Sequence, residues 1–314
     1  MHALATLPQV ETLPATSIAV QDLLAAFMGG LNRNTLRAYR QSMEDFAGFA
    51  GVATVDEAAR SLLGQGQGSA NHTALLYRAS LLERGLSPAT VNARLAALRS
   101  LVKLARTLGI VAWGLEVASV KSQSYRDTKG PGSVGVRGIL KVAKEEGTDK
   151  GLRDEAIIRL LHDLGLRRAE VVALDIADVN LEAGTVAILG KGRTEKECLT
   201  LPAPTRTALA AWVAVRGEED GPLFHNFHRD GRRERLSGWG VWYLVKGLGE
   251  QVGSRVRPHG IRHTAITEAL DATGGNVRAV QRFSRHRDLR TLCRYDDNRQ
   301  DLGGQVANLV AIEE

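Results

Sequence analysis

The chain has 314 residues, of which 44% are hydrophobic and 24% charged, and it contains two cysteines. This composition is ordinary for a globular protein and excludes both a disulfide-rich scaffold and a low-complexity chain. Lys and Arg outnumber Asp and Glu by 41 to 35, a net charge of +6, which permits nucleic-acid binding without requiring it. The length predicts two domains, each able to bury a core.

The first 15 residues, which include two prolines, predict a flexible leader. They lack the basic start and the uninterrupted apolar run of a secretory signal. The sequence has no stretch of about 18 residues that is both apolar and uncharged, so no membrane span is predicted. Because Cys198 and Cys293 have no CxxC or metal-ligand spacing, we expect an intracellular protein with no disulfide framework.

Residues 16–120 predict a compact all-helical domain. Ser87 followed by Pro88 is typical of an N-cap with proline at the first helical position. The glycine-rich segment 64–69 predicts a loop. An earlier helix, opening at Asn34 and Thr35, carries apolar residues at helical steps: Leu36, Tyr39, Met43, Phe46 and Phe49.

Residues 121–134, rich in Gly, Ser and charge, predict a linker, and residues 135–314 a second domain. Apolar alternation predicts short strands, two of which form a hairpin around Gly190-Lys-Gly-Arg. The fold expected is therefore mainly α with a small antiparallel β-sheet (α+β). We expect helices at 136–146, 151–164, 203–216, 238–251, 260–273 and 276–282, and strands at 171–176, 185–189 and 197–201.

Cationic side chains recur in the second domain in a particular order. Arg167 follows an apolar helical segment, with Glu170 three residues later; the pair is either a solvated ion pair at a helix end or part of an anion site. Lys191 lies in a glycine-flanked turn. It is either an ordinary hairpin-tip lysine or a mobile ammonium that can protonate a leaving oxygen.

The last fifth of the chain adds a nucleophile to these cations. His259 and Arg262 have the i, i+3 spacing of one helical face, and His286 precedes Tyr295 in a short basic segment. Arginines neutralise phosphate oxygens and a phenol can act as a nucleophile. Each residue alone is compatible with packing or a solvated surface, but their joint order predicts attack on a phosphodiester.

Two histidine pairs raise the question of a metal site. His259 and His263 have i, i+4 spacing but no third ligand or adjacent carboxylate. His225 and His228 are expected in a surface loop. We therefore expect no metal and no cofactor.

With these motifs in order, the chain resembles the tyrosine recombinases, the phage integrase family that includes Cre and the Xer resolvases. The matching segments are Gly165-Leu-Arg-Arg-Ala-Glu170, Gly190-Lys-Gly192, His259-Gly-Ile-Arg-His263, His286 and Tyr295, with family-like helix openings at 34–39 and 86–95. Ile261 replaces the usual leucine, and Arg285 stands where many members have glycine. The basic stretch 282–290 is expected to add phosphate contacts.

The resemblance implies a site-specific recombinase that cleaves and rejoins DNA through a 3′-phosphotyrosyl intermediate and a Holliday junction, without ATP. Tyr295 is the implied nucleophile, Lys191 protonates the leaving 5′-oxygen and His259 assists proton transfer. The other implied catalytic residues are Arg167, Arg262 and His286, which bind the phosphate, with Glu170 in a supporting role.

The resemblance also implies a partner and an assembly. The partner is a double-stranded DNA recombination site, and the assembly is a homo-tetramer, or a hetero-tetramer with a related recombinase. The expected location is cytoplasmic and nucleoid-associated, with no membrane contact. The tail 303–314, which we place after a Gly-Gly hinge, docks either on a neighbouring protomer or on its own domain.

Three alternatives stay open at this stage. A type IB topoisomerase has a similar catalytic set, but the helical first domain and the tail argue against it. A catalytically silent DNA-binding protein is expected to lack at least one of these catalytic residues. A transposon or integron-type integrase differs in its target and not in its chemistry.

Overall fold

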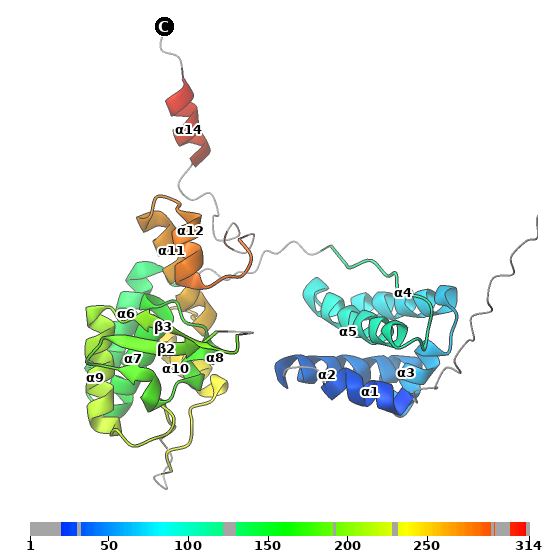
Figure 1. Cartoon of the computed structure of the whole chain (residues 1–314). Coiled ribbons are helices and arrows are strands. Elements are labelled where there is room, and N and C mark those ends of the chain that lie inside the picture. The colour runs from blue at the N-terminus through cyan, green and yellow to red at the C-terminus, as the bar shows by residue number, and fades with distance from the viewer. Residues whose placement is uncertain are drawn as a thin grey trace, which may run out of the picture. The chain divides into compact units, whose positions relative to one another are not determined.

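In the computed structural model the chain divides into two compact units, residues 1–125 and 126–314 (Figure 1). The structure describes residues 20–29, 33–121, 130–190, 193–227, 232–289, 292 and 302–311. The expected leader, residues 1–15, lies outside the described residues. Among the described helices, none is both long and apolar enough to cross a membrane.

The first unit is all-helical in its described part, as predicted. Its helices are α1 (Val20–Gly29), α2 (Arg33–Ala50), α3 (Val55–Leu63), α4 (Gln67–Glu83) and α5 (Pro88–Thr107). Each contributes apolar side chains to one core, which includes Leu23, Phe46, Leu62, Tyr77, Leu95 and Leu98.

Local signals explain where several of these helices begin. The Ser87 hydroxyl accepts a hydrogen bond from the Thr90 backbone N–H, so α5 opens at the predicted cap. Thr54 and Glu57 form a reciprocal capping box on α3. The predicted loop 64–69 was too long, because α4 already begins at Gln67 after the extended Gly66.

Polar bonds to the Asp45 carboxylate join three helices of the first unit. The Tyr77 hydroxyl on α4 donates to Asp45 Oδ1 on α2 at 2.8 Å. Arg84 adds a bidentate contact of 3.1 and 2.7 Å to the same carboxylate, and Arg94 on α5 pairs with it too. Charge-assisted bonds of this kind set the helix register as well as adding stability.

The second unit is mainly helical with one small sheet, which confirms the predicted fold class. Its earlier helices are α6 (Gly132–Glu145), α7 (Asp149–Asp163), α8 (Arg168–Ala173) and the 3₁₀ turn η1 (Ile176–Asp178). The later ones are α9 (Ala203–Arg216), α10 (Gly238–Gln251), α11 (Pro258–Ala272), α12 (Val277–Ser284) and α14 (Leu302–Val310). Helix α6 begins inside the range expected for the linker.

The sheet contains β1 (Val179–Asn180), β2 (Thr185–Leu189) and β3 (Lys196–Thr200), all antiparallel in that order. Thr185 pairs with Thr200 and Leu189 with Lys196, so the predicted hairpin is present with β3 shifted by one residue. The strand predicted at 171–176 was wrong. Residues 171–173 end α8, whose helix is started by the cap at Arg167, and Ile176 begins η1. Between them Leu174 and Asp175 are extended, with an isolated bridge from Asp175 to Pro222.

Helix α7 lies at the centre of the second unit (Figure 1) and packs against α6, α9 and α11. Its apolar residues, including Ile157, Leu160 and Leu161, are fully buried. His225, expected in a surface loop, is 5% exposed, because its ring packs against Trp212 at 5.3 Å between centroids. His228 lies outside the described residues.

The expected C-terminal tail contains helix α14. The Gly303-Gly304 pair, expected as a hinge before it, falls inside the helix. Leu309 and Val310 are 84% and 71% exposed.

Candidate active site

Arg167 and Glu170 form the first part of the site. Arg167 is the N-cap of α8, and Glu170 Oε2 accepts a hydrogen bond from its backbone N–H at 2.7 Å. Glu170 Oε1 accepts a second bond, also 2.7 Å, from Arg167 Nη1. The Glu170 side chain is 3% exposed and that of Arg167 28%. The carboxylate therefore holds a guanidinium that still reaches solvent, while neighbouring Arg168 is exposed.

The pKa of Glu170 reflects this setting. Burial raises the pKa of its carboxyl, but the Arg167 N–H and the charges of Arg285 and Arg167 outweigh burial and bring it below its usual value. Glu170 is therefore an anion at neutral pH. It acts as a hydrogen-bond acceptor for the arginines and not as a proton donor.

Arg262 reaches the same place from α11. Its side chain is 2% exposed. Nη1 donates to the Gly165 carbonyl, just before Arg167, and Nη2 donates to the Ser284 carbonyl at the end of α12. These backbone acceptors orient the planar guanidinium without neutralising its charge.

His286 lies beside Arg262, with 3.5 Å between its Nε2 and Arg262 Nη2. Gln281 Nε2 donates to the His286 carbonyl at 3.0 Å and holds the backbone. Burial, followed by the charges of Arg262 and Arg167, lowers the pKa of His286 to about 4. The ring is thus neutral at physiological pH, and can donate from one nitrogen only.

His259 lies on the first turn of α11, directly after Pro258, and is exposed. Its charge also contributes to the low pKa of His286, after burial and the two arginines, which places it near the same group. The N-terminus of a 15-residue helix carries unsatisfied N–H groups and a partial positive charge. His259 therefore stands at a place suited to a phosphate.

Arg285 does not have the role expected from the sequence. It belongs to the basic stretch that was expected to add phosphate contacts, but its side chain is 5% exposed and pairs with Glu170 at 3.2 Å. Its main chain is left-handed, with φ 54° and ψ 38°, and closes α12. Arg287, two residues on, is exposed.

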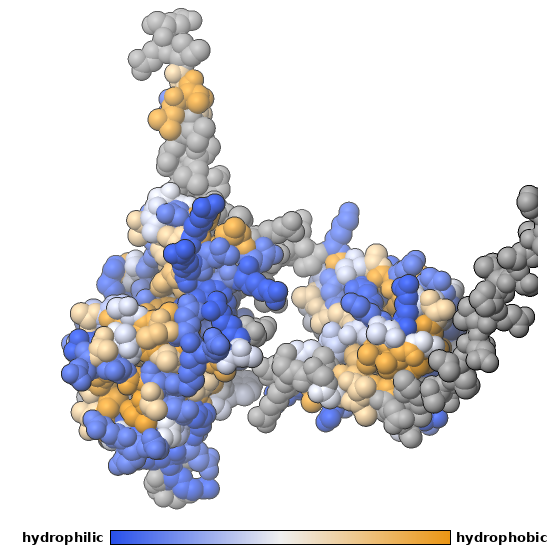
Figure 2. All heavy atoms as spheres, viewed as in Figure 1, coloured by the Kyte–Doolittle hydropathy of each residue, from blue (hydrophilic) through white to orange (hydrophobic). Residues whose placement is uncertain are grey.

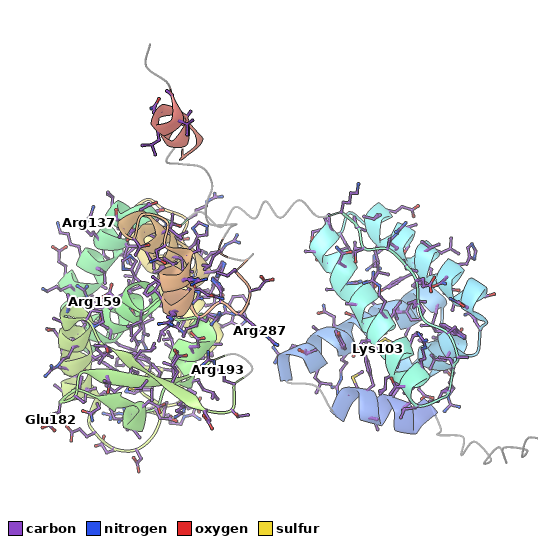
Figure 3. All side chains as sticks on the ribbon, turned by 45° about the horizontal axis from the view of Figure 1, so that its top comes forward. Lys103, Arg137, Arg159, Glu182, Arg193 and Arg287 are labelled. Carbon is purple, nitrogen blue, oxygen red and sulfur yellow. The ribbon has the colours of Figure 1, made fainter. Side chains whose placement is uncertain are left out.

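Lys191 and Tyr295 lie outside the described residues. The hairpin that would carry Lys191 is described up to Gly190 and from Arg193, whose N–H donates to the Gly190 carbonyl at 3.1 Å. In Figure 3, Arg193 and Arg287 lie on the same side of the second unit, away from Arg137.

The described residues thus bring together four of the expected groups: Arg167, Glu170, Arg262 and His286. Within the described ranges no cluster of three His, Cys, Asp or Glu side chains could hold a metal ion. In the view of Figure 2, hydrophilic residues gather over α11 and α12, while apolar ones gather around α7 and α9. The concentration of cations at the site suits an anionic substrate.

Comparison with known proteins gives the family. The phage integrase family matches residues 135–301. The chain is 42% identical over 287 residues to a tyrosine recombinase of Synechococcus elongatus, covering 88% of this chain and 89% of that protein. It is 38% identical over 284 residues to one of Synechocystis sp., covering 88% and 90%. The chain belongs to the phage integrase family of tyrosine recombinases, which confirms the resemblance.

The fold is shared with solved recombinases. The crystal structure of the XerH site-specific recombinase, bound to palindromic difH substrate in a post-cleavage complex, superposes with a TM-score of 0.68. The match covers 93% of this chain and 85% of that one, at 19% identity. At that identity the likeness is one of fold.

Several site features could not be found from sequence motifs. The carbonyls of Gly165 and Ser284 accept from Arg262, and a main-chain acceptor has no residue signature. The amide of Gln281 that holds the His286 backbone has no motif either. The only sequence signal for Arg285 was its departure from the family glycine.

Proposed function

We propose that this protein is a site-specific DNA recombinase that cleaves and rejoins DNA through a 3′-phosphotyrosyl intermediate. The observation that carries the proposal is the convergence of Arg167 and Arg262 on neutral His286. This cluster presents cationic and neutral donors to one anion, in a chain that belongs to the tyrosine recombinases.

In the proposed reaction the Tyr295 oxygen attacks the scissile phosphorus. The new bond joins Tyr295 to the 3′-phosphate while the bond to the 5′-oxygen breaks. His259 accepts the phenol proton, and Lys191 gives a proton to the leaving 5′-oxygen. The covalent ester keeps the phosphodiester linkage for religation, so neither ATP nor another energy source is consumed.

Arg167 and Arg262 are proposed to bind the non-bridging oxygens, with His286 as a further donor. Their bonds to the main chain and to Glu170 preorganise them for the charge that develops on the phosphate. Removing one such donor typically raises the barrier by about 3–4 kcal/mol. No step in this scheme requires a metal or other cofactor.

We propose that the protein acts on two DNA recombination sites as a tetramer and passes through a Holliday junction. The tail 303–314 is proposed to dock on a neighbouring protomer, which is supported by the exposed Leu309 and Val310 of α14. A protein with this activity works where the DNA is, so we place it in the cytoplasm at the nucleoid. Deleting 303–314 is expected to reduce synapsis more than binding to one site, and equal loss of both would contradict the tail's role.

The test is covalent trapping on nicked suicide substrates taken from the DNA beside the native gene, with EDTA present. The wild type is expected to form an adduct stable on a denaturing gel, and Tyr295→Phe to bind the DNA without forming one. Tyr243→Phe, which removes an exposed tyrosine hydroxyl from α10 of the same unit, is the matched control and should still form the adduct.

The remaining outcomes separate the alternatives. An adduct that persists in Tyr295→Phe refutes the assigned nucleophile. Relaxation of supercoiled DNA without strand exchange between two sites would indicate a type IB topoisomerase activity. Salt-sensitive binding with no adduct from the wild type would indicate a catalytically silent DNA-binding protein.

A further inference from the structure

We propose that Arg285 is a positioning residue that holds the supports of both catalytic arginines, Arg167 and Arg262, from inside the protein. Only its activity readouts rest on the proposed function. The Arg285 side chain is buried, so it is not placed for the phosphate contacts expected of the basic stretch 282–290.

Both terminal nitrogens of the Arg285 guanidinium have acceptors inside the protein. Nη1 donates to the carbonyls of Leu164 at 3.1 Å and Phe283 at 2.9 Å. Nη2 donates to the Gly165 carbonyl at 3.0 Å and to Glu170 Oε2 at 3.2 Å. Both terminal nitrogens are therefore used inside the unit, which leaves no donor of theirs directed at DNA.

Two of these acceptors also serve the catalytic arginines. The Gly165 carbonyl accepts from Arg262 Nη1 as well as from Arg285. The Glu170 carboxylate accepts from Arg167 as well as from Arg285. Arg285 thus restrains one acceptor of each catalytic arginine, and a shift of either acceptor would move a guanidinium that has to meet the phosphate.

The main chain of Arg285 contributes a third link. Its carbonyl accepts from Arg167 Nη2 at 3.0 Å. Among the described residues, Arg285 is the only one other than glycine with a positive φ. The left-handed region is unfavourable for an L-residue, and that conformation places this carbonyl. Retaining arginine there, where glycine would be unstrained, favours a role for the side chain.

The charges agree with this arrangement. Arg285 and Glu170 are 5% and 3% exposed, so their ion pair lies almost out of solvent. Removing one partner of a buried pair leaves the other charge uncompensated. Three effects act most strongly on the pKa of Glu170. Burial raises it, whereas the bond from the Arg167 N–H and then the charge of Arg285 lower it. Loss of Arg285 should therefore weaken Glu170 as an acceptor for Arg167.

The test uses Arg285→Asn, since asparagine tolerates the left-handed region and is too short to reach the acceptors of the guanidinium. Exposed Arg287→Asn is the matched control from the same segment. Arg285→Asn is expected to cleave suicide substrate about tenfold to a hundredfold more slowly at saturating DNA, as misplaced catalytic groups do. Its affinity for DNA and the salt dependence of that affinity should match the wild type.

Two further readouts separate positioning from general damage to the fold. The acid limb of the cleavage rate should move to higher pH in Arg285→Asn, because the Glu170 carboxyl is protonated more easily. Glu170→Gln combined with Arg285→Asn should be no slower than the slower single variant, because both act through one support. Arg285→Lys, which keeps the charge, should restore the wild-type acid limb.

The salt dependence of DNA affinity in Arg285→Asn could instead weaken by about one phosphate contact while the cleavage rate at saturating DNA stays unchanged. That result would establish a phosphate contact and overturn the proposal. An unmoved acid limb, or multiplying losses in the double variant, would overturn it as well.

If the wild type forms no Tyr295-dependent adduct, the proposed function fails and the Arg285 inference is judged by NMR. The side-chain carboxyl of Glu170 in the full chain is then titrated directly. Its pKa should rise in Arg285→Asn and stay unchanged in Arg287→Asn. Equal values in all three proteins would refute the role of Arg285 independently of any activity.

Discussion

Gly165→Ala tests how closely the site depends on one backbone position. Gly165 has φ +53°, a conformation that alanine adopts with strain. A Cβ placed there would lie 3.2 Å from two ring atoms of Phe283. The Gly165 carbonyl accepts from both Arg262 and Arg285, so any adjustment at this residue reaches the Arg262 guanidinium.

Two effects set how much Gly165→Ala lowers the free energy of unfolding. The left-handed conformation costs alanine about 1–2 kcal/mol. Phe283 is half-buried and can turn aside, at a rotamer cost of about 1 kcal/mol. Together these lower the free energy of unfolding of the second unit by about 2–3 kcal/mol. Alanine also restricts the unfolded chain, and this offsets about 0.4–1 kcal/mol of the lost stability, as it would at any glycine.

Gly253→Ala is the matched control for this experiment. Gly253 has φ +68°, but a Cβ there would meet nothing within 4 Å. Gly253→Ala therefore has the same left-handed backbone cost and the same restriction of the unfolded chain, but its new Cβ makes no steric contact. The difference between the two variants isolates the Phe283 contact and the displaced carbonyl, and is expected to be about 1 kcal/mol.

The assay is urea unfolding followed by tryptophan fluorescence in a Trp113→Phe background. Trp113 belongs to the first unit, whereas buried Trp212 reports on the second. Cleavage of suicide substrate is measured alongside, and only Gly165→Ala is expected to slow it, about tenfold or more. If Gly165→Ala costs no more than Gly253→Ala and cleaves at the wild-type rate, the coupling between Gly165 and Arg262 is refuted.

Three further predictions concern pH and packing. His286 has a pKa of about 4 against an ordinary 6.5, so it binds a proton at lower pH than the unfolded chain does, and stability should fall as pH drops from 6.5 toward 4. Histidine NMR should show that its ring stays neutral within this window, and a ring that protonates near pH 6.5 would contradict the prediction. Burial lowers the pKa of His162, but carboxylates such as Asp163 raise it more strongly. Its contribution to stability is therefore complete below pH 6.5 and is lost as pH rises through the higher folded pKa. His162→Gln should remove that part of the pH dependence of the unfolding midpoint, and an unchanged profile would contradict the prediction. Gly130→Ala would place a Cβ 2.0 Å from Thr264 Oγ1, so this variant should lower the thermal midpoint of the second unit and release the chain before α6 from α11, which hydrogen exchange can detect.

The sequence by itself determined the local features. Apolar spacing and the Ser87-Pro88 cap located α5, and helices α9 and α10 occupy the predicted ranges because their signals lie within each segment. The order of Arg167, Glu170, Arg262 and His286 likewise identified the family, since motif order needs no coordinates.

Only the tertiary structure decided the features that join distant segments. Residues 171–176 have a strand-like composition, but the Arg167–Glu170 cap and the packing of α8 against α7 and α10 make the first part helical. His225 became buried because Trp212 on helix α9 covers it. Arg285 turned inward because its acceptors at 164, 165 and 170 are remote in sequence. Whether a cation faces solvent or a buried carboxylate depends on contacts that form only when the chain folds.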